Sequence, residues 1–493
     1  MNYYKIYTMK HFTSFLWLLF SLLFLASCVS NQDKTDAKQK KQGQTTEVKK
    51  LAKAETTKPA VADETPAANK PSPEKVGPIE NKPVPAPPGY SVYGPRKVPG
   101  SSGRPLIIFL DPHANGKIPV ALYQNLAEEH GFLLIGSNEI RSGMSGREVI
   151  ASFDSLFQMA KRDYPVDENR IYLMGFSGGA RVALAFAEAY PEIKAVIASG
   201  AGIQAGVKAP KPTFSFLGMA GNEDFNMIEI INTDRSLKRQ GFERAMIIFD
   251  GDHNWPPVAA AEEAFQWLDL VAMKEKPMPG GPTKIKAAEE WYLQKANSLK
   301  NEGRIFDSYE VAERGLTVLD GLTDLSSLRT LAGEIRKNPV YKEQLSEMVK
   351  TMQQEMGLQN NYMQAFTGED MEWWAAELEK LNDPGTKQSE QLMKKRLLAF
   401  LGVMAYMISD RAVNEKDVEG SEKYLEIYRT LEPTNPEHAY LEAKRRMMMN
   451  EQSSALAYLR LAVVFGFVDK ARLFNEPAFI PIHDNPEFIG LLE

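Results

Sequence analysis

A serine between glycines is the first feature of this sequence that could do chemistry. Ser177 lies in a Gly-Phe-Ser-Gly-Gly stretch, a G-x-S-x-G pattern that follows the apolar run Ile171–Met174 and precedes an alanine-rich helical pattern starting at Ala180. Glycines are needed where a strand turns sharply into a helix that passes close to it. The pattern therefore predicts that Ser177 is a nucleophile at the edge of a sheet, beside a helix N-terminus that favours developing negative charge.

A serine nucleophile needs a base within hydrogen-bond reach and a third group that orients the base. Between Ser177 and the C-terminal helical region the sequence has one histidine, His253, which follows the apolar run Ala245–Phe249 directly. Position and uniqueness predict that His253 is the base.

The run Ala245–Phe249 leads to His253, and the run before it along the chain is Thr213–Leu217. The acid that orients the histidine is expected after this earlier run. Asp224 follows the apolar run Thr213–Leu217 and a glycine-containing turn, so we predict that it holds the imidazole tautomer and stabilises the imidazolium. Its neighbour Glu223 could substitute. Asp250 and Asp252 flank the histidine, but residues adjacent in sequence usually point apart.

An oxyanion intermediate needs two N–H donors. One is expected from Gly178, the residue after the nucleophile, and the other from His113 or Ala114 in the loop after the first strand. An alanine can donate its N–H but tolerates fewer backbone angles than glycine. Loss of one donor would raise the barrier by roughly 2.7–4 kcal/mol.

Short apolar strands alternate with helical patterns between residues 105 and 273. This alternation predicts an α/β fold with a mostly parallel sheet covered by helices on both faces. Catalytic residues of such sheets lie at the carboxyl ends of the strands, where Ser177, Asp224 and His253 are expected. Only residues 200–212 separate two of the strands, so we expect no long lid and a site that is open or covered by the helical region.

Residues 100–273 resemble the α/β-hydrolase superfamily. The resemblance rests on the G-x-S-x-G pattern, the Gly-Asn-Glu-Asp stretch that ends at Asp224 and the His-Asn-Trp-Pro-Pro stretch that starts at His253. Residues 100–273 are most similar to compact esterases grouped with dienelactone hydrolases and polyhydroxybutyrate-depolymerase-like or feruloyl-type esterases. The resemblance implies hydrolysis of a small-molecule or polymer ester through an acyl-enzyme, with no cofactor. It covers about a third of the chain.

The N-terminal residues resemble a bacterial lipoprotein signal. A basic start and an eleven-residue apolar run end in Leu-Ala-Ser followed by Cys28, the one cysteine of the chain. The resemblance implies cleavage before Cys28 and attachment of several acyl chains, which anchor stably where one would not. We therefore expect a lipid-anchored protein of the bacterial cell envelope, on a membrane face that the sequence does not identify, with either Met1 or Met9 as its start.

The remaining segments follow from composition. Prolines, lysines and alanines without hydrophobic periodicity predict an unfolded tether before the α/β region. After a Pro-Gly linker, helical patterns with alanine spacing similar to a tetratricopeptide repeat suggest either a protein-binding domain or a domain that braces the hydrolase. The predicted segments are a signal peptide at 1–28, a tether at 29–95, an α/β-hydrolase domain at 96–273, a linker at 274–287 and a tetratricopeptide-like domain at 288–493.

A net charge of -6 with mixed signs gives no indication of a nucleic-acid partner, and six scattered histidines with one cysteine predict no metal site. The sequence leaves three functions open. The first is a membrane-tethered serine esterase. The second is a serine peptidase or acyltransferase on the same triad. The third is an inactive hydrolase-fold scaffold that binds protein through its helical region.

Overall fold

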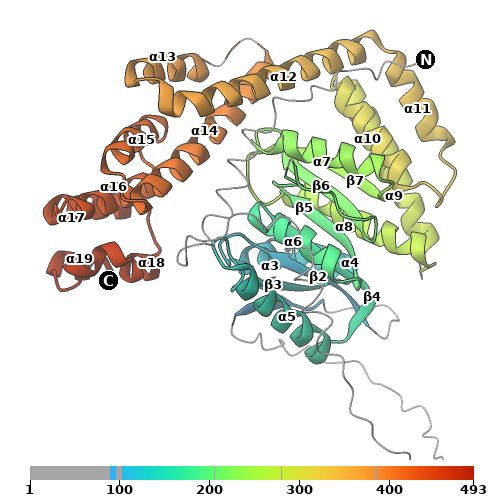
Figure 1. Ribbon diagram of the computed structural model, residues 1–493. Coiled ribbons are helices and arrows are strands. Elements are labelled where there is room, and N and C mark those ends of the chain that lie inside the picture. The colour runs from blue at the N-terminus through green and yellow to red at the C-terminus, as the bar shows by residue number, and fades with distance from the viewer. Residues whose placement is uncertain are drawn as a thin grey trace, which may run out of the picture.

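The computed structural model describes residues 89–95, 103–204, 206–278, 280–383, 385 and 387–492. The predicted signal peptide, Cys28 and residues 29–88 of the predicted tether lie outside the described residues. Within them, an α/β region with a central sheet precedes a large helical region (Figure 1).

The sheet has seven strands in the order β1-β3-β2-β4-β5-β6-β7. Strands β2 to β7 are parallel and β1 is antiparallel at the edge beside β3. The inner strands are mostly apolar, apart from the polar start of β4 at residues 167–170, because both faces of the sheet are covered. The strands are β1 (Tyr90–Tyr93), β2 (Arg104–Leu110), β3 (Leu133–Ser137), β4 (Val166–Phe176), β5 (Ile193–Ser199), β6 (Ser215–Gly221) and β7 (Arg244–Phe249).

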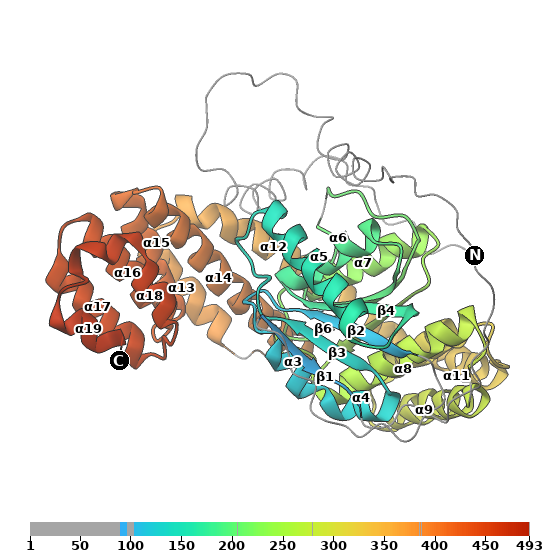
Figure 2. The ribbon, with the colours of Figure 1, turned by 90° about the horizontal axis from the view of Figure 1, so that it is seen from below.

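Helices cover the two faces of the sheet, as Figure 2 shows. One face packs against α4 and α8, and alternate residues of the same strands pack against α5 and α6 on the other face. The helices of this region are α3 (Lys117–Leu122), α4 (Gln124–His130), α5 (Gly146–Asp163), α6 (Gly178–Ala189), α7 (Met227–Arg239) and α8 (Val258–Glu275). The predicted α/β architecture with a mostly parallel sheet is confirmed.

Two predicted boundaries are corrected. Residues 90–93, assigned to the tether, form β1, because Tyr90 and Val92 pack against the sheet core while the backbone pairs with β3. Residues 281–287, assigned to the linker, are the start of α9 (Gly281–Asn301). Pro282 is compatible with this helix because it lies in the first turn, where its missing N–H removes no helical hydrogen bond.

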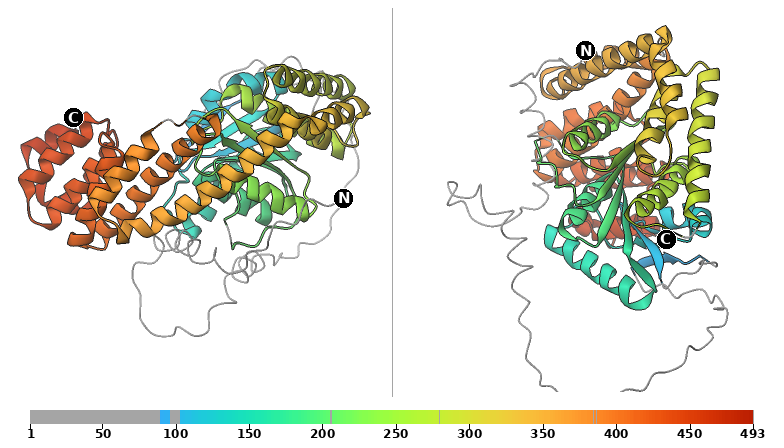
Figure 3. Two further views of the ribbon diagram at one scale, coloured as in Figure 1. Left: turned by 90° about the horizontal axis from the view of Figure 1, so that it is seen from above. Right: turned by 90° about the vertical axis from the view of Figure 1, so that its right-hand side faces the viewer.

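The helical region has two hydrophobic cores. Helices α9–α11 share one core with a face of the sheet, whereas a second core begins within α12 and continues to the C-terminus. Figure 3 shows the resulting elongated arrangement. The helices after α9 are α10 (Ile305–Val318), α11 (Ser326–Lys337), α12 (Pro339–Gly368), α13 (Met371–Asn382), α14 (Gln388–Asn414), α15 (Val418–Leu431), α16 (Pro436–Met448), α17 (Gln452–Val464), α18 (Lys470–Asn475) and α19 (Pro486–Leu492), with a 3₁₀ turn at Pro477–Ile482.

Among the helices of the described residues, only α14 is long and apolar enough, by length and composition, to cross a membrane. Half of its most apolar window is buried inside the protein, where α14 packs against α12 and α15.

Candidate active site

Ser177 stands alone between the end of β4 at Phe176 and the start of α6 at Gly178. Its backbone has φ 50° and ψ -120°, a strained conformation for a residue with a side chain. The flanking glycines are required by close approach. A Cβ on Gly175 would lie 2.3 Å from the carbonyl oxygen of Gly179, and a Cβ on Gly179 would lie 2.0 Å from that of Leu110. The predicted sharp turn between strand and helix is therefore present.

The structure brings Ser177, His253 and Asp224 together at the carboxyl ends of β4, β7 and β6. The Oγ of Ser177 lies 3.0 Å from Nε2 of His253, and Nδ1 of His253 lies 2.9 Å from Oδ1 of Asp224. A carboxylate only accepts hydrogen bonds, so Nδ1 carries the proton and Nε2 is left to accept from the serine hydroxyl. This serine–imidazole–carboxylate arrangement has the geometry that a nucleophile, a base and an orienting acid would need.

The acid is buried and the base is reachable. Asp224 is 1% exposed, and its Oδ1 also accepts from the backbone N–H of Asn226 at 2.8 Å, while its Oδ2 has no hydrogen-bond partner. The imidazole of His253 lies between the rings of Phe176 and Phe225, with centroids 4.8 Å and 4.4 Å away. These rings limit the orientations of the imidazole and keep it facing Ser177.

Two of the three alternative acids have other partners. Glu223 pairs with Lys395 at 2.6 Å, and Asp250 accepts from the side-chain amide of Asn222 at 2.7 Å. Of the four acids considered from the sequence, Asp224 is the one that contacts His253.

The predicted oxyanion loop is organised by Asp111, which follows β2. The N–H of His113 donates to Oδ1 of Asp111 at 2.8 Å, and the N–H of Ala114 donates to its backbone oxygen at 3.2 Å. Neither amide is free to bind an oxyanion in this conformation, which revises the prediction for these two residues. The physical reason is that the N–H groups of a short loop after a buried strand find acceptors within the loop, here the carboxylate and the backbone oxygen of Asp111. Gly178 is the first residue of α6, where the N–H has no acceptor inside the helix.

A small cavity of about 80 Å³ lies between this loop and the start of α6. Gly178 and Gly179 form one wall and Asp111 and Pro112 another. The remaining lining combines the apolar residues Ile140, Met144, Val149 and Val182 with Arg141, Ser142 and Gly143. A cavity of this size beside Gly178 could receive a small, mostly apolar group.

Asp111 also fixes the histidine loop, a role that the sequence analysis missed. Its Oδ2 accepts from Nε1 of Trp255 at 2.9 Å, and the hydroxyl of Tyr123 donates to the carbonyl oxygen of Pro256 at 2.8 Å. Burial raises the pKa of Tyr123 far above its ordinary value, so the hydroxyl stays protonated and can donate. The available signal was an acidic residue directly after an apolar strand, but its partner lies more than a hundred residues away.

Replacing Asp111 with Asn is expected to slow the reaction of Ser177 with a serine-directed fluorophosphonate by about 10- to 100-fold. An amide NH₂ group would replace one carboxylate oxygen of Asp111. This donor would face another donor, either the indole N–H of Trp255 or the backbone N–H of His113. We also expect a loss of roughly 1–3 kcal/mol in the free energy of unfolding, measured with urea. Trp255→Phe is the matched variant, because it removes the indole N–H that donates to Asp111 and leaves the hydrogen bonds from His113 and Ala114 to Asp111 intact. Wild-type rate and stability in Asp111→Asn would contradict this role.

Among the described residues no group of three or more His, Cys, Asp or Glu side chains is arranged to hold a metal ion.

No family model and no curated protein matches this chain. Solved structures that match it include the fluorophosphonate-binding serine hydrolase F of Staphylococcus aureus, with 14% identity over 36% of this chain and 91% of the other, at a TM-score of 0.31. An S-formylglutathione hydrolase from Agrobacterium tumefaciens matches with 14% identity over 36% and 88%, at 0.29. A ferulic acid esterase matches with 17% identity over 37% and 91%, at 0.29. Scores this low carry no argument, so function has to be inferred from the atoms of the site.

Proposed function

We propose that this protein is a serine hydrolase that cleaves carboxylic esters through an acyl-enzyme. The observation that carries the proposal is the continuous contact from Ser177 Oγ through His253 to Asp224, with distances of 3.0 Å and 2.9 Å. A strained backbone at Ser177 supports it, because strain of this kind persists where the surroundings hold a functional residue in place.

In the proposed reaction, Oγ of Ser177 forms a bond to the ester carbonyl carbon while Nε2 of His253 takes its proton. The carbonyl oxygen becomes an oxyanion near the N–H of Gly178. The bond to the leaving alcohol then breaks, and His253 returns the proton to that alcohol. Water repeats the sequence on the acyl-enzyme and releases the acid. Asp224 stays ionised throughout and stabilises the imidazolium.

The cavity beside Gly178 supports a preference for short acyl groups. Its volume of about 80 Å³ holds roughly five to eight water-sized groups, which suits a chain of a few carbons. We expect p-nitrophenyl butyrate to exceed p-nitrophenyl decanoate by at least about 10-fold in kcat/KM. Met144→Ala, which widens the cavity, should narrow that ratio, whereas Ile150→Ala on the exposed side of α5 should not. Equal rates for both esters in the wild type would contradict the assignment of the cavity.

We also propose that the chain is a lipoprotein of the bacterial cell envelope, attached to the membrane through Cys28. Within the helical region, α16 and α17 form a pair of short helices connected by a tight turn, which supports a tetratricopeptide-like pair. The much longer α12 and α14 do not fit that repeat. A protein partner would bind on this region.

A substrate panel tests the proposal and separates it from its rivals. The full-length wild type and Ser177→Ala are compared on matched butyryl ester, thioester and anilide substrates. Preferential ester hydrolysis that requires Ser177 supports an esterase, whereas preferential anilide hydrolysis supports a peptidase. Absence of turnover on every substrate by a folded wild type would overturn the hydrolase proposal in favour of a scaffold.

A further inference from the structure

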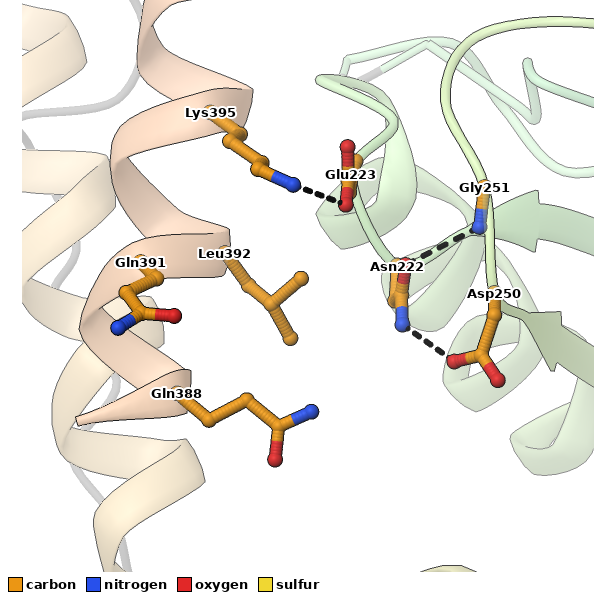
Figure 4. Close-up of a pocket in the computed structure, with 8 residues that line it drawn as sticks. All are labelled: Asn222, Glu223, Asp250, Gly251, Gln388, Gln391, Leu392 and Lys395. Atoms are coloured by element: carbon orange, nitrogen blue, oxygen red, sulfur yellow. Dashed lines mark hydrogen bonds and ion pairs between the residues drawn. The ribbon is translucent and has the colours of Figure 1, made fainter. Parts of the chain in front are cut away.

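The loop that carries Asp224 is in contact with the helical region. We call residues 222–226, between β6 and α7, the acid loop. Nη1 of Arg396 in α14 donates to the carbonyl oxygen of Asn222 at 2.6 Å, and Nζ of Lys395 pairs with Glu223 at 2.6 Å. Figure 4 shows Lys395 reaching across to Glu223 from α14. Arg396 and Lys395, two consecutive residues of α14, therefore contact Asn222 and Glu223, the two residues that precede Asp224. The two contacts join residues that are 174 and 172 positions apart in the sequence.

A buried carboxylate fixes the guanidinium of Arg396. Its Nε lies 3.0 Å from both carboxylate oxygens of Glu355 in α12, and its Nη2 lies 2.6 Å from Oε2. Glu355 is fully buried and Arg396 is 4% exposed. A buried ion pair of this kind rarely adds stability over apolar residues of the same size. What the pair does provide is a guanidinium in one fixed orientation, with Nη1 directed at the acid loop.

Phe225 provides a second connection. Its ring contacts the imidazole of His253, and the same side chain packs against the hydrophobic core of α12–α19. Met352 of α12 packs against α7, the helix that follows the acid loop. The loop is thus enclosed between the base and the helical region.

Side-chain packing does not fill this interface. A cavity of about 470 Å³ lies between α14 and the loops after β6 and β7, bordered by Gln388, Gln391 and Leu392 on one side and by Asp250 and Gly251 on the other (Figure 4). Because side chains do not pack closely across this gap, hydrogen bonds and ion pairs have to fix the position of the acid loop. The Arg396 contact is the most buried of these.

We propose that Arg396, oriented by Glu355, is a positioning residue of the active site: it holds the acid loop so that Asp224 reaches His253. The helical region is then a structural part of the catalytic centre as well as an appended domain. This inference rests on the proposed serine hydrolase function, since a misplaced acid matters only where the triad turns over substrate.

The test uses the full-length chain with Glu355 and Arg396 both replaced by Met. Removing both charges leaves no unpaired buried ion, so the fold is expected to survive, while the donor to Asn222 is lost. We expect kcat for p-nitrophenyl butyrate to fall by about 10- to 100-fold with little change in KM, because the cavity beside Gly178 is lined by other residues. Arg396→Lys keeps a cation and a donor and should recover part of the lost kcat.

The matched control is Glu442→Met with Arg445→Met, a second buried pair, in α16, a helix that packs against α14, α15 and α17. Their other partners, Arg446 and Glu422, are 26% and 67% exposed, so the control also leaves no fully buried ion unpaired. Its kcat should equal that of the wild type. The inference is overturned if the Glu355/Arg396 variant keeps wild-type kcat, or if both double variants lose kcat equally, which would indicate a general loss of stability. If the wild type itself neither hydrolyses esters nor reacts with a fluorophosphonate, the proposed function fails first and this inference fails with it.

Discussion

Ser177→Ala and His253→Ala are each expected to lower kcat for ester hydrolysis by about 10⁶-fold, and the double variant should lose no more than either single variant. The reason is that the two side chains act as one unit through their 3.0 Å contact, so that removal of either ends nucleophilic attack. Turnover of p-nitrophenyl butyrate by the three variants, at concentrations well above KM, measures the effect.

Both single variants should fold normally. Ser177 is partly exposed, and removing its hydroxyl also relieves no strain, because alanine retains a Cβ at the same φ of 50°. Urea unfolding and circular dichroism serve as the check. Additive losses, with the double variant far slower than either single variant, would mean that the serine and histidine do not share one catalytic step.

Asp224→Asn is expected to lower kcat by about 10⁴-fold, the loss that follows from this change in a serine protease triad. The asparagine amide can present an N–H to Nδ1 of His253, which would then have to accept. The ring proton would shift to Nε2, and Nε2 could no longer take the proton of Ser177. Single-turnover hydrolysis of p-nitrophenyl butyrate separates this chemical step from product release.

Glu223→Gln is the matched control, because it changes the neighbouring carboxylate, which faces Lys395 rather than the imidazole. We expect its kcat to remain within about 3-fold of the wild type, because the glutamine side-chain oxygen can still accept from Lys395 and the more buried Arg396 contact with the loop is unchanged. A larger loss in Glu223→Gln than in Asp224→Asn would show that the wrong carboxylate has been assigned as the acid.

Sequence patterns were sufficient for the parallel strands of the α/β region and for the three residues that meet at its edge. Each of these strands contains an apolar run, and each of the three residues directly follows such a run or the turn after it. Because parallel strands place their carboxyl ends along one edge, order along the chain was enough to bring Ser177, Asp224 and His253 together. Its place just beyond a glycine-containing turn favoured Asp224, whereas its neighbour Glu223 stayed open as a substitute, and Asp250 and Asp252 were disfavoured because residues adjacent in sequence usually point apart.

Contacts between distant segments had no sequence signal. The roles of Asp111 and Arg396 depend on partners 144 and 174 residues away, and no local pattern records such pairs. The prediction for His113 and Ala114 was revised for a local reason, because their N–H groups already bond to the side chain and the backbone oxygen of Asp111. The short edge strand Tyr90–Tyr93 was not predicted, because it directly follows a proline-rich segment. Its stability depends on pairing with β3 and on packing against the sheet core.

The most direct test of the central claim is covalent labelling of the full-length protein with a fluorophosphonate, followed by peptide mapping of the modified residue. An activated serine attacks the phosphorus and retains the phosphonyl group, whereas an ordinary serine does not react at neutral pH. We predict one adduct, on Ser177, that is absent from His253→Ala. No adduct on Ser177 in a folded wild-type protein would contradict an activated nucleophile at this site.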